Sequence, residues 1–306
     1  MFLMKNIMNH NSNNVTSTSK EIANSININV TSVVGDNFGD AVNGRFWHMM
    51  SGKQIVSNAS TNHYLTTGSI MCIARPTSII FGTGFIGKYA DLGGGSFISK
   101  KSVRHCMPQK VIAVRGPLSR DKLLNMGVNC PENYGDPLLL MPCIYDKKSE
   151  GEEKTVGIIP HYVDRNSENY LKLKTNLEAS GYKVKFIDIV VGSNYEKIID
   201  EINECEYIVS SSLHGTMMGI VYNKKTVFTE FSKNVIGNGF KFDDFFYSIN
   251  TKYEKKNIYD STLLDNVINV DYNYLKSLGS KLIKLIPFIE NNRKIELLSV
   301  YERFYE

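Results

Sequence analysis

The chain alternates between short aliphatic or β-branched runs and longer amphipathic stretches, with glycine at most of the changes. The first apolar run, residues 25–34, stops at GDNFGD (35–40), and AVNGRFWHMM then has the spacing of a helix. Two further apolar runs, 76–82 and 110–116, also end at glycine, and Ser119 can cap a helix after the second. This succession is typical of a parallel sheet flanked by helices.

A second series begins after YDKKSEGEEK (145–154), a charged and aperiodic stretch that predicts a linker. The strands that we expect beyond it lie at 155–161, 182–190, 206–212 and 225–231. The helices expected between them lie near 167–180, 194–204 and 215–222. From 261 onward the spacing is helical, and Pro287 breaks the run. The basic stretch around Lys281 and Lys284 fits packing against the domains or contact with a membrane surface.

We therefore predict an α/β protein with two Rossmann-like, doubly wound domains and C-terminal helices. The expected divisions are a leader at 1–27, domains at 28–144 and 155–260 joined by the 145–154 linker, and a helical segment at 261–306. The leader is expected to be flexible, because 13 of its 27 residues are Asn, Ser or Thr and no apolar core follows its start. Two such domains in series bind ligands between them, at the carboxyl ends of their strands.

Composition excludes several classes of protein. The 306 residues are 42% hydrophobic, yet no apolar stretch is long enough for a membrane span. A net charge of +4 without a recognisable reader motif argues against nucleic acid as a partner. The five cysteines form no CxxC pair, the histidines lack ligand spacing, and Asp243 and Asp244 are helix neighbours that face different ways. We expect a reducing cytoplasm, no metal and no cofactor.

Positive charge gathers between Lys88 and Lys122, where eight Lys or Arg residues stand against two Asp residues. Such a surplus is either a solvated face or a means of drawing an anion into a cleft. The glycine turns at 35–40 and 82–87 also allow two interpretations. Either they are tight connections, or backbone amides beside Gly39, Gly82 and Gly84 approach an anion.

Several side chains of reactive type follow predicted strands. Arg115 ends the strand in VRGPLS, where a guanidinium grips a carboxylate or phosphate, or else ties the domains together by a salt bridge. His214 follows the strand in SSSLHG, where an imidazole protonates a substrate, pairs with phosphate or serves a structural role. Asp136 and His161 occupy similar strand ends. Asp40 and Asp36 either handle substrate hydroxyls or cap a helix.

The ordered set GDNFGDAVN, FGTG, VRGPLS, GDP, IPH, SSSLHG and GFKFDDFFYSI resembles the polysaccharide pyruvyl transferase family. The resemblance is closest to its bacterial exopolysaccharide ketal-pyruvate branch and covers roughly residues 28–250. It implies a GT-B-like pair of domains that transfers pyruvate from phosphoenolpyruvate (PEP) to a sugar, forming a ketal across two hydroxyls. It also implies an acceptor on a polysaccharide or lipid-linked oligosaccharide, with cytoplasmic location and peripheral contact with the inner membrane face.

The resemblance also carries site residues. It assigns Arg115 and His214 to PEP binding and catalysis, and Asp40 is our candidate carboxylate for the sugar hydroxyls. A basic residue after the histidine belongs to the pattern, and Lys241 or Lys233 fills that place. Substrate contacts are further expected from the following residues: Asp36, Gly39, Gly82, Gly84, Asp136, His161, Ser212 and Leu213. Some members carry Arg where this chain has Ser212, so part of the phosphate grip must come from elsewhere.

Two other functions share this architecture. A GT-B glycosyltransferase would take a nucleotide sugar and release a nucleoside diphosphate, whereas a carbohydrate-binding protein would keep the fold without turnover. The acceptor sugar, the ketal stereochemistry and the oligomeric state cannot be read from residue types, because several loops together form a sugar pocket.

Overall fold

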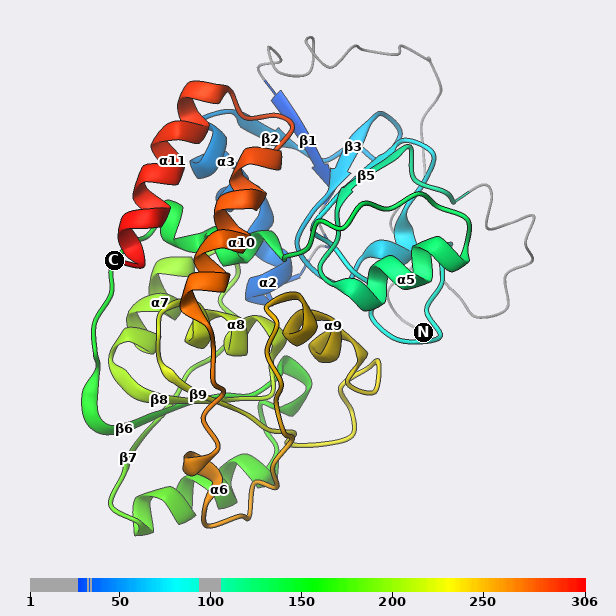
Figure 1. Cartoon of the computed structure of the whole chain (residues 1–306). Helices are drawn as coiled ribbons and strands as arrows, with labels where there is room; N and C mark the ends of the chain where they lie inside the picture. The colour runs from blue at the N-terminus through cyan, green and yellow to red at the C-terminus, as the bar shows by residue number, and fades with distance from the viewer. Residues whose placement is uncertain (1–26, 32, 34, 94–105) are drawn as a thin grey trace.

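The computed structural model of the chain describes residues 27–31, 33, 35–93 and 106–306. Within them, two parallel sheets carry helices on their faces and stack as an N-terminal and a C-terminal lobe (Figure 1). This confirms the predicted α/β class with parallel sheets. The expected leader lies outside the described residues, apart from Asn27, which begins the first strand.

The sheet of the N-terminal lobe has the strand order β2-β1-β3-β4-β5, and every pairing is parallel. Its strands are β1 (Asn27–Thr31), β2 (Gln54–Val56), β3 (His63–Leu65), β4 (Ser78–Phe81) and β5 (Lys110–Ala113). The sequence predicted three of them, with longer bounds. It missed β2 and β3, because three residues are too few to establish an alternating pattern.

The sheet of the C-terminal lobe repeats this order as β7-β6-β8-β9, again entirely parallel. Its strands are β6 (Glu152–Ile159), β7 (Lys183–Phe186), β8 (Cys205–Ser210) and β9 (Lys225–Phe228). The last three residues of the expected linker therefore belong to β6. The preceding residues are fastened to the C-terminal lobe, where Lys224 Nζ donates to Ser149 O at 2.5 Å and Asn203 Nδ2 donates to Lys147 O at 2.8 Å.

Helices cover both faces of each sheet, as a doubly wound fold requires. In the N-terminal lobe, α3 (Asn43–Ser51) and the 3-10 helix η2 (Pro137–Cys143) cover one face, and α5 (Pro117–Asn125) covers the other. In the C-terminal lobe, α7 (Tyr195–Asn203) and α8 (Leu213–Val221) lie opposite α6 (Glu168–Ala179). The short α2 (Phe38–Ala41) and α9 (Phe240–Ser248) lie at the junction of the lobes (Figure 1).

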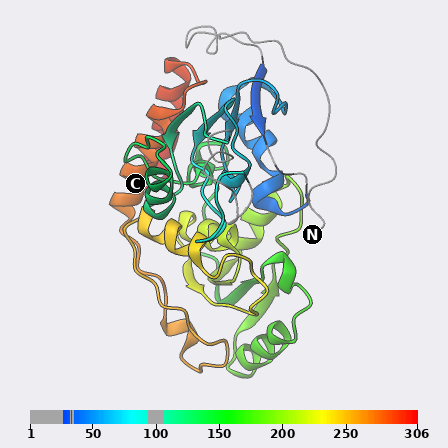
Figure 2. The same ribbon diagram turned by 90° about the vertical axis from the view of Figure 1, so that its right-hand side faces the viewer.

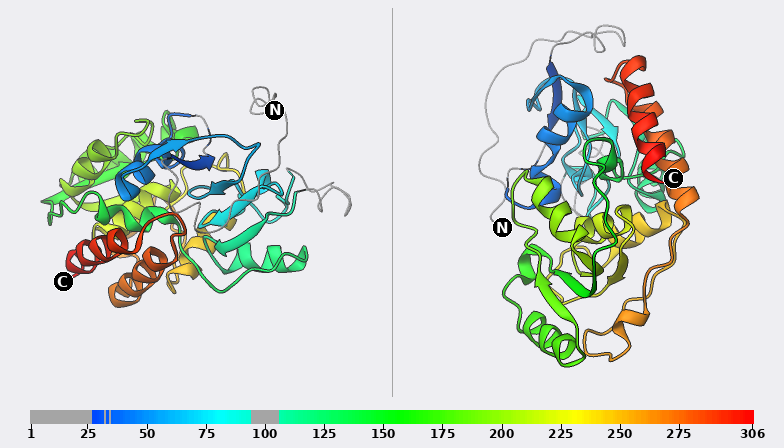
Figure 3. Two further views of the ribbon diagram at one scale, coloured as in Figure 1. Left: turned by 90° about the horizontal axis from the view of Figure 1, so that it is seen from above. Right: turned by 90° about the vertical axis from the view of Figure 1, so that its left-hand side faces the viewer.

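The C-terminal helices α10 (Tyr272–Leu285) and α11 (Asn291–Phe304) return to the N-terminal lobe. Both contact η2, and α10 also contacts β5 (Figures 2 and 3). The loop between them inserts Phe288 against Trp47 and Tyr64, with ring centroids 4.9 and 4.6 Å apart. One continuous apolar core therefore joins both lobes and these helices. Of the two interpretations of the basic stretch at Lys281, the packing one describes α10, which buries Leu275, Leu278, Leu282 and Ile283.

Candidate functional site

The two sheets turn the carboxyl ends of their strands toward each other. In a sheet of order 2-1-3-4, loops leave in opposite directions after the first and third strands, and ligands bind in the crevice between those loops. The loops after β1 and β3 in the N-terminal lobe thus face the loops after β6 and β8 in the C-terminal lobe. Five polar residues meet there, which we call the interlobe cluster: Asp40, Asp136, His161, His214 and Lys241.

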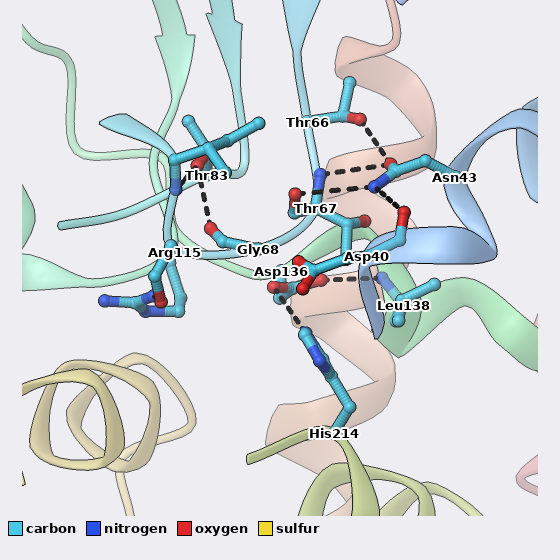
Figure 4. A network of polar contacts seen from close by, with 12 residues as sticks. Asp40, Asn43, Thr66, Thr67, Gly68, Thr83, Arg115, Asp136, Leu138 and His214 are labelled. Carbon is cyan, nitrogen blue, oxygen red and sulfur yellow. Dashed lines mark hydrogen bonds and ion pairs between the residues drawn. The ribbon is translucent and has the colours of Figure 1, made fainter. Parts of the chain in front are cut away.

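His214 and Asp136 form the centre of the interlobe cluster (Figure 4). His214 Nε2 lies 3.6 Å from Asp136 Oδ2, and both side chains are buried. Neither of these two atoms has a hydrogen-bond partner among the described residues. Asp136 Oδ1 is occupied, since it accepts the Leu138 N–H at 3.0 Å as the cap of η2. Buried polar atoms without partners are rare, so this gap calls for a polar ligand or water.

Lys241 and His161 form the second pair. Lys241 Nζ lies 3.3 Å from His161 Nε2, and both residues are buried. Burial, together with the charges of Lys241 and His214, lowers the pKa of His161 to about 3, so this imidazole is neutral near pH 7. Burial and the Arg115 charge lower the pKa of Lys241 to about 8, against the opposite effect of Asp40. Lys241 is therefore a cation whose proton is unusually easy to remove.

The loop after β1 brings Gly39 and Asp40 to the cluster but not Asp36. Gly39 lies against the His214 ring, where a Cβ would come within 1.6 Å of Nδ1. Asp40 Oδ2 accepts a hydrogen bond from Asn37 Nδ2 at 3.0 Å, and the Asp40 backbone belongs to a network with Asn43 and Thr67 (Figure 4). Asp36 has an exposed side chain, and its carbonyl oxygen accepts the Gly192 N–H of the C-terminal lobe at 2.8 Å.

Arg115 does not point into the interlobe cluster, and its predicted contact with PEP stays a prediction. Its Nε and Nη2 lie 3.0 and 2.9 Å from Asp244 Oδ2, Nη1 donates to Ser69 Oγ, and Nη2 donates to Phe85 O. Arg115 and Asp244 are both fully buried. The alternative that the sequence left open, a salt bridge between the domains, is what the structure contains. Figure 4 shows the guanidinium directed away from His214.

The sequence predicted no role for Asp244, which was named with Asp243 only as one of two helix neighbours that face different ways. Besides Arg115, its carboxylate accepts the Ser119 N–H at 2.9 Å and the Ser119 hydroxyl at 2.6 Å. Gly116 allows this approach, since a Cβ there would lie 1.8 Å from the Asp244 carbonyl oxygen. The VRGPLS motif thus serves to dock α9. No local signal in the sequence could have revealed this, because the pair spans 129 residues.

Gly82 and Gly84 both lie in close contact with side chains. A Cβ at Gly82, where φ is +95°, would come within 2.4 Å of the Pro137 ring. A Cβ at Gly84 would come within 2.6 Å of the Arg115 guanidinium carbon. The space beside each of them is therefore filled by a side chain, which fits a tight connection, and the predicted approach of an anion to their backbone amides stays a prediction.

Of the remaining predicted residues, some lie near the interlobe cluster and one is exposed to solvent. Ser212 caps α8, where its Oγ accepts the Gly215 N–H at 3.4 Å, and Leu213 is buried in the first turn beside His214. Of the two candidate lysines, Lys233 has a side chain that is 93% exposed and lies 3.4 Å from Glu230. Lys241 is the one that reaches the interlobe cluster.

The basic stretch that ends at Lys122 is partly paired where it is described, although Lys88 and Lys110 are exposed. Arg115 is buried against Asp244, Lys122 pairs with Asp91 at 3.0 Å, and Arg120 Nε donates to Cys130 O. The basic residues 100, 101 and 104 lie outside the described residues.

The described residues contain neither a cluster of metal-ligand side chains nor a membrane-spanning helix. Within them, no three His, Cys, Asp or Glu side chains gather as metal ligands would, and the expected metal independence stays a prediction. No helix in the same residues has the length and apolar character needed to cross a membrane. The five cysteines are unpaired.

Comparison with known proteins adds one match. The sequence model of a family described as polysaccharide pyruvyl transferase matches residues 69–232, or 164 of 306 positions. This span contains Arg115, Asp136, His161 and His214, whereas Asp40 and Lys241 lie outside it. No curated protein matched the chain.

Proposed function

Because the chain belongs to the polysaccharide pyruvyl transferase family, we propose that it transfers pyruvate from PEP to a sugar, forming a pyruvate ketal. The acceptor would be a sugar of a polysaccharide or of a lipid-linked oligosaccharide. We further propose that the two facing lobes correspond to a GT-B-like arrangement. The observation that carries the proposal is the interlobe cluster, where an ammonium and two imidazoles meet two carboxylates at the crevice of two parallel sheets.

The charge of the donor fits this cluster. PEP carries a carboxylate and a phosphate, and a buried cation with unpartnered donors stabilises such groups more strongly than a solvated one. Among the described residues, Lys241 supplies the cation of the interlobe cluster, since Arg115 is paired with Asp244. The buried His214 Nε2 makes no hydrogen bond within the part of the chain that the structure describes, and Asp136 Oδ2 lies 3.6 Å from it, so this atom can engage the donor.

The reaction needs an acid and a base. A proton adds to the methylene carbon of PEP, and a first sugar hydroxyl attacks the adjacent carbon and loses its proton. The bond from that carbon to the phosphate oxygen then breaks, and a second hydroxyl attacks with loss of its own proton. The net products are a cyclic ketal and one inorganic phosphate. We assign the acid to His214 and the base to Asp40, with Asp136 Oδ2 as the carboxylate oxygen that lies 3.6 Å from His214 Nε2.

His161 takes a different role in this scheme. The contact from Val163 N–H to its Nδ1 is long, at 3.4 Å. Its Nε2 lies 3.3 Å from Lys241 Nζ, where a neutral imidazole can accept a hydrogen bond from the ammonium. We therefore assign His161 to orienting Lys241 rather than to proton transfer with the substrate.

The direct test is an incubation of the purified full chain with PEP and a panel of oligosaccharides, read by mass spectrometry and phosphate release. We expect a sugar product heavier by pyruvate less one water, with one phosphate released for each product. Lys241→Met should abolish this product, whereas Lys233→Met, a matched loss of an exposed lysine, should not. Release of a nucleoside diphosphate from a nucleotide sugar, or glycan binding without any turnover, would contradict the proposal.

A further inference from the structure

Helix α9 presents two charged residues to two different places. Lys241, in its first turn, lies in the interlobe cluster, and Asp244, three residues later, lies on the N-terminal lobe. Residues three apart on a helix share one side of it. The position of Asp244 on its partners therefore determines where the Lys241 ammonium lies.

The Asp244 carboxylate accepts more hydrogen bonds than a simple ion pair would provide. Its Oδ1 accepts the Ser119 N–H, and its Oδ2 accepts Arg115 Nε and the Ser119 hydroxyl, so both oxygens are satisfied while fully buried. The Ser119 N–H belongs to the first turn of α5, whose own cap residue, Gly116, has no side chain. A carboxylate there satisfies an otherwise unpaired helix amide and complements the positive end of the helix.

We propose that Asp244 is a positioning residue for Lys241: it pins α9 to the start of α5 and neutralises Arg115, fixing both the place and the protonation of the Lys241 amine. Its relevance to catalysis rests on the function proposed above. The effect of the Asp244 charge on the Lys241 amine does not depend on that function.

The sign of the effect follows from the charges around Lys241. Arg115 and Asp40 are the charged groups that act on its pKa, and His161 is its direct neighbour. Arg115 opposes a proton on Lys241, and Asp40 favours it. The negative charge of Asp244 cancels part of the Arg115 field. Removing that charge alone should therefore lower the pKa of Lys241 below its value of about 8.

The experiment is a pH titration of the Lys241 Cε resonance in the full chain labelled with 13C-lysine, assigned by its loss in Lys241→Arg. In Asp244→Asn, which keeps the shape of the side chain, we expect the titration midpoint to fall by on the order of one pH unit. In Asp243→Asn, the matched change one residue away, we expect the wild-type midpoint. Asp243 faces Tyr253, whose hydroxyl donates to it at 2.7 Å.

A second variant covers the case in which Asp244→Asn does not fold. Arg115→Gln combined with Asp244→Asn leaves no unpaired buried charge, and replacing both members of a buried pair is far better tolerated than replacing one. Because this double variant also removes the Arg115 charge, the Lys241 midpoint should rise above the wild-type value. An unchanged midpoint in both variants, or a shift in the opposite direction, would overturn the proposal.

The titration also separates this proposal from the proposed function. If the wild-type chain consumes PEP, the alkaline limb of its phosphate-release profile should move with the Lys241 midpoint in each variant. If the wild-type chain releases no phosphate from PEP, the function is wrong, yet the signed shifts of the Lys241 resonance still decide the role of Asp244.

Discussion

At the residue scale, the reactive side chains separate into those that meet at the junction of the lobes and those that hold the lobes together. His214, His161 and Asp40 could be brought together from the sequence, because each follows a strand of a parallel sheet and such ends share one edge. Asp136 follows only the isolated parallel bridge between Val114 and Tyr134. Arg115 could not be assigned in the same way. A guanidinium at a strand end suits a ligand and an ion pair equally, and its partner Asp244 lies far along the chain.

Burial of a neutral imidazole makes a prediction about stability. The pKa of His161 is about 3 in the folded chain and near 6.5 when unfolded, so the unfolded chain binds more protons between these values. The free energy of unfolding should therefore fall as the pH drops through this window, by on the order of 3 kcal/mol from pH 7 to pH 4 for this residue alone. His161→Gln should lose that part of the dependence in urea denaturation. If the free energies of unfolding of the two proteins depend on pH with the same slope, His161 is not neutral in the folded state.

At the scale of elements, the sequence predicted where units begin better than where they end. The strand expected at 182–190 ends at Phe186, because the chain then leaves the sheet and contacts the other lobe. There the Ile189 carbonyl accepts the Phe38 N–H at 2.8 Å, and Val190 forms an antiparallel bridge with Asn37. A β-branched run looks the same whether it pairs within its own sheet or across a lobe contact, so only the tertiary structure distinguishes them.

The docking of α9 on α5 makes a prediction of its own. Gly116→Ala places a methyl group against the Asp244 carbonyl oxygen and should destabilise the chain by about 1 to 3 kcal/mol. Gly44→Ala is the matched control, because Gly44 lies inside α3 with nothing within 4 Å of its added Cβ. That change should raise the melting temperature slightly, as alanine favours a helix. If both variants melt alike, the contact between Gly116 and Asp244 is not as tight as described.

At the scale of the whole molecule, the two lobes share one continuous apolar core. The sequence predicted two domains and a terminal helical segment, but it could not show that this segment returns to the first lobe. Amphipathic spacing in α10 and α11 says that one face is buried, not against which partner. Because Phe288 reaches Trp47 and Tyr64, the core continues from the C-terminal helices into the first sheet.

This continuity predicts cooperative unfolding. Phe288→Ala should lower the stability of the whole chain by about 3 to 5 kcal/mol, with one calorimetric transition rather than two. Ile295→Ala, on the exposed side of α11, should change stability by less than about 0.5 kcal/mol. Two separate transitions, of which only the first shifts in Phe288→Ala, would mean that the lobes unfold independently.

The most direct test of the interlobe cluster as the donor site is a titration of PEP into the full chain with 13C-labelled histidine, followed through the imidazole Cε1 resonances. We predict that the resonances of His161 and His214 shift together and saturate, while those of His48 and His63, which lie elsewhere in the N-terminal lobe, stay in place. Resonances of His161 and His214 that do not move at saturating PEP would contradict the account.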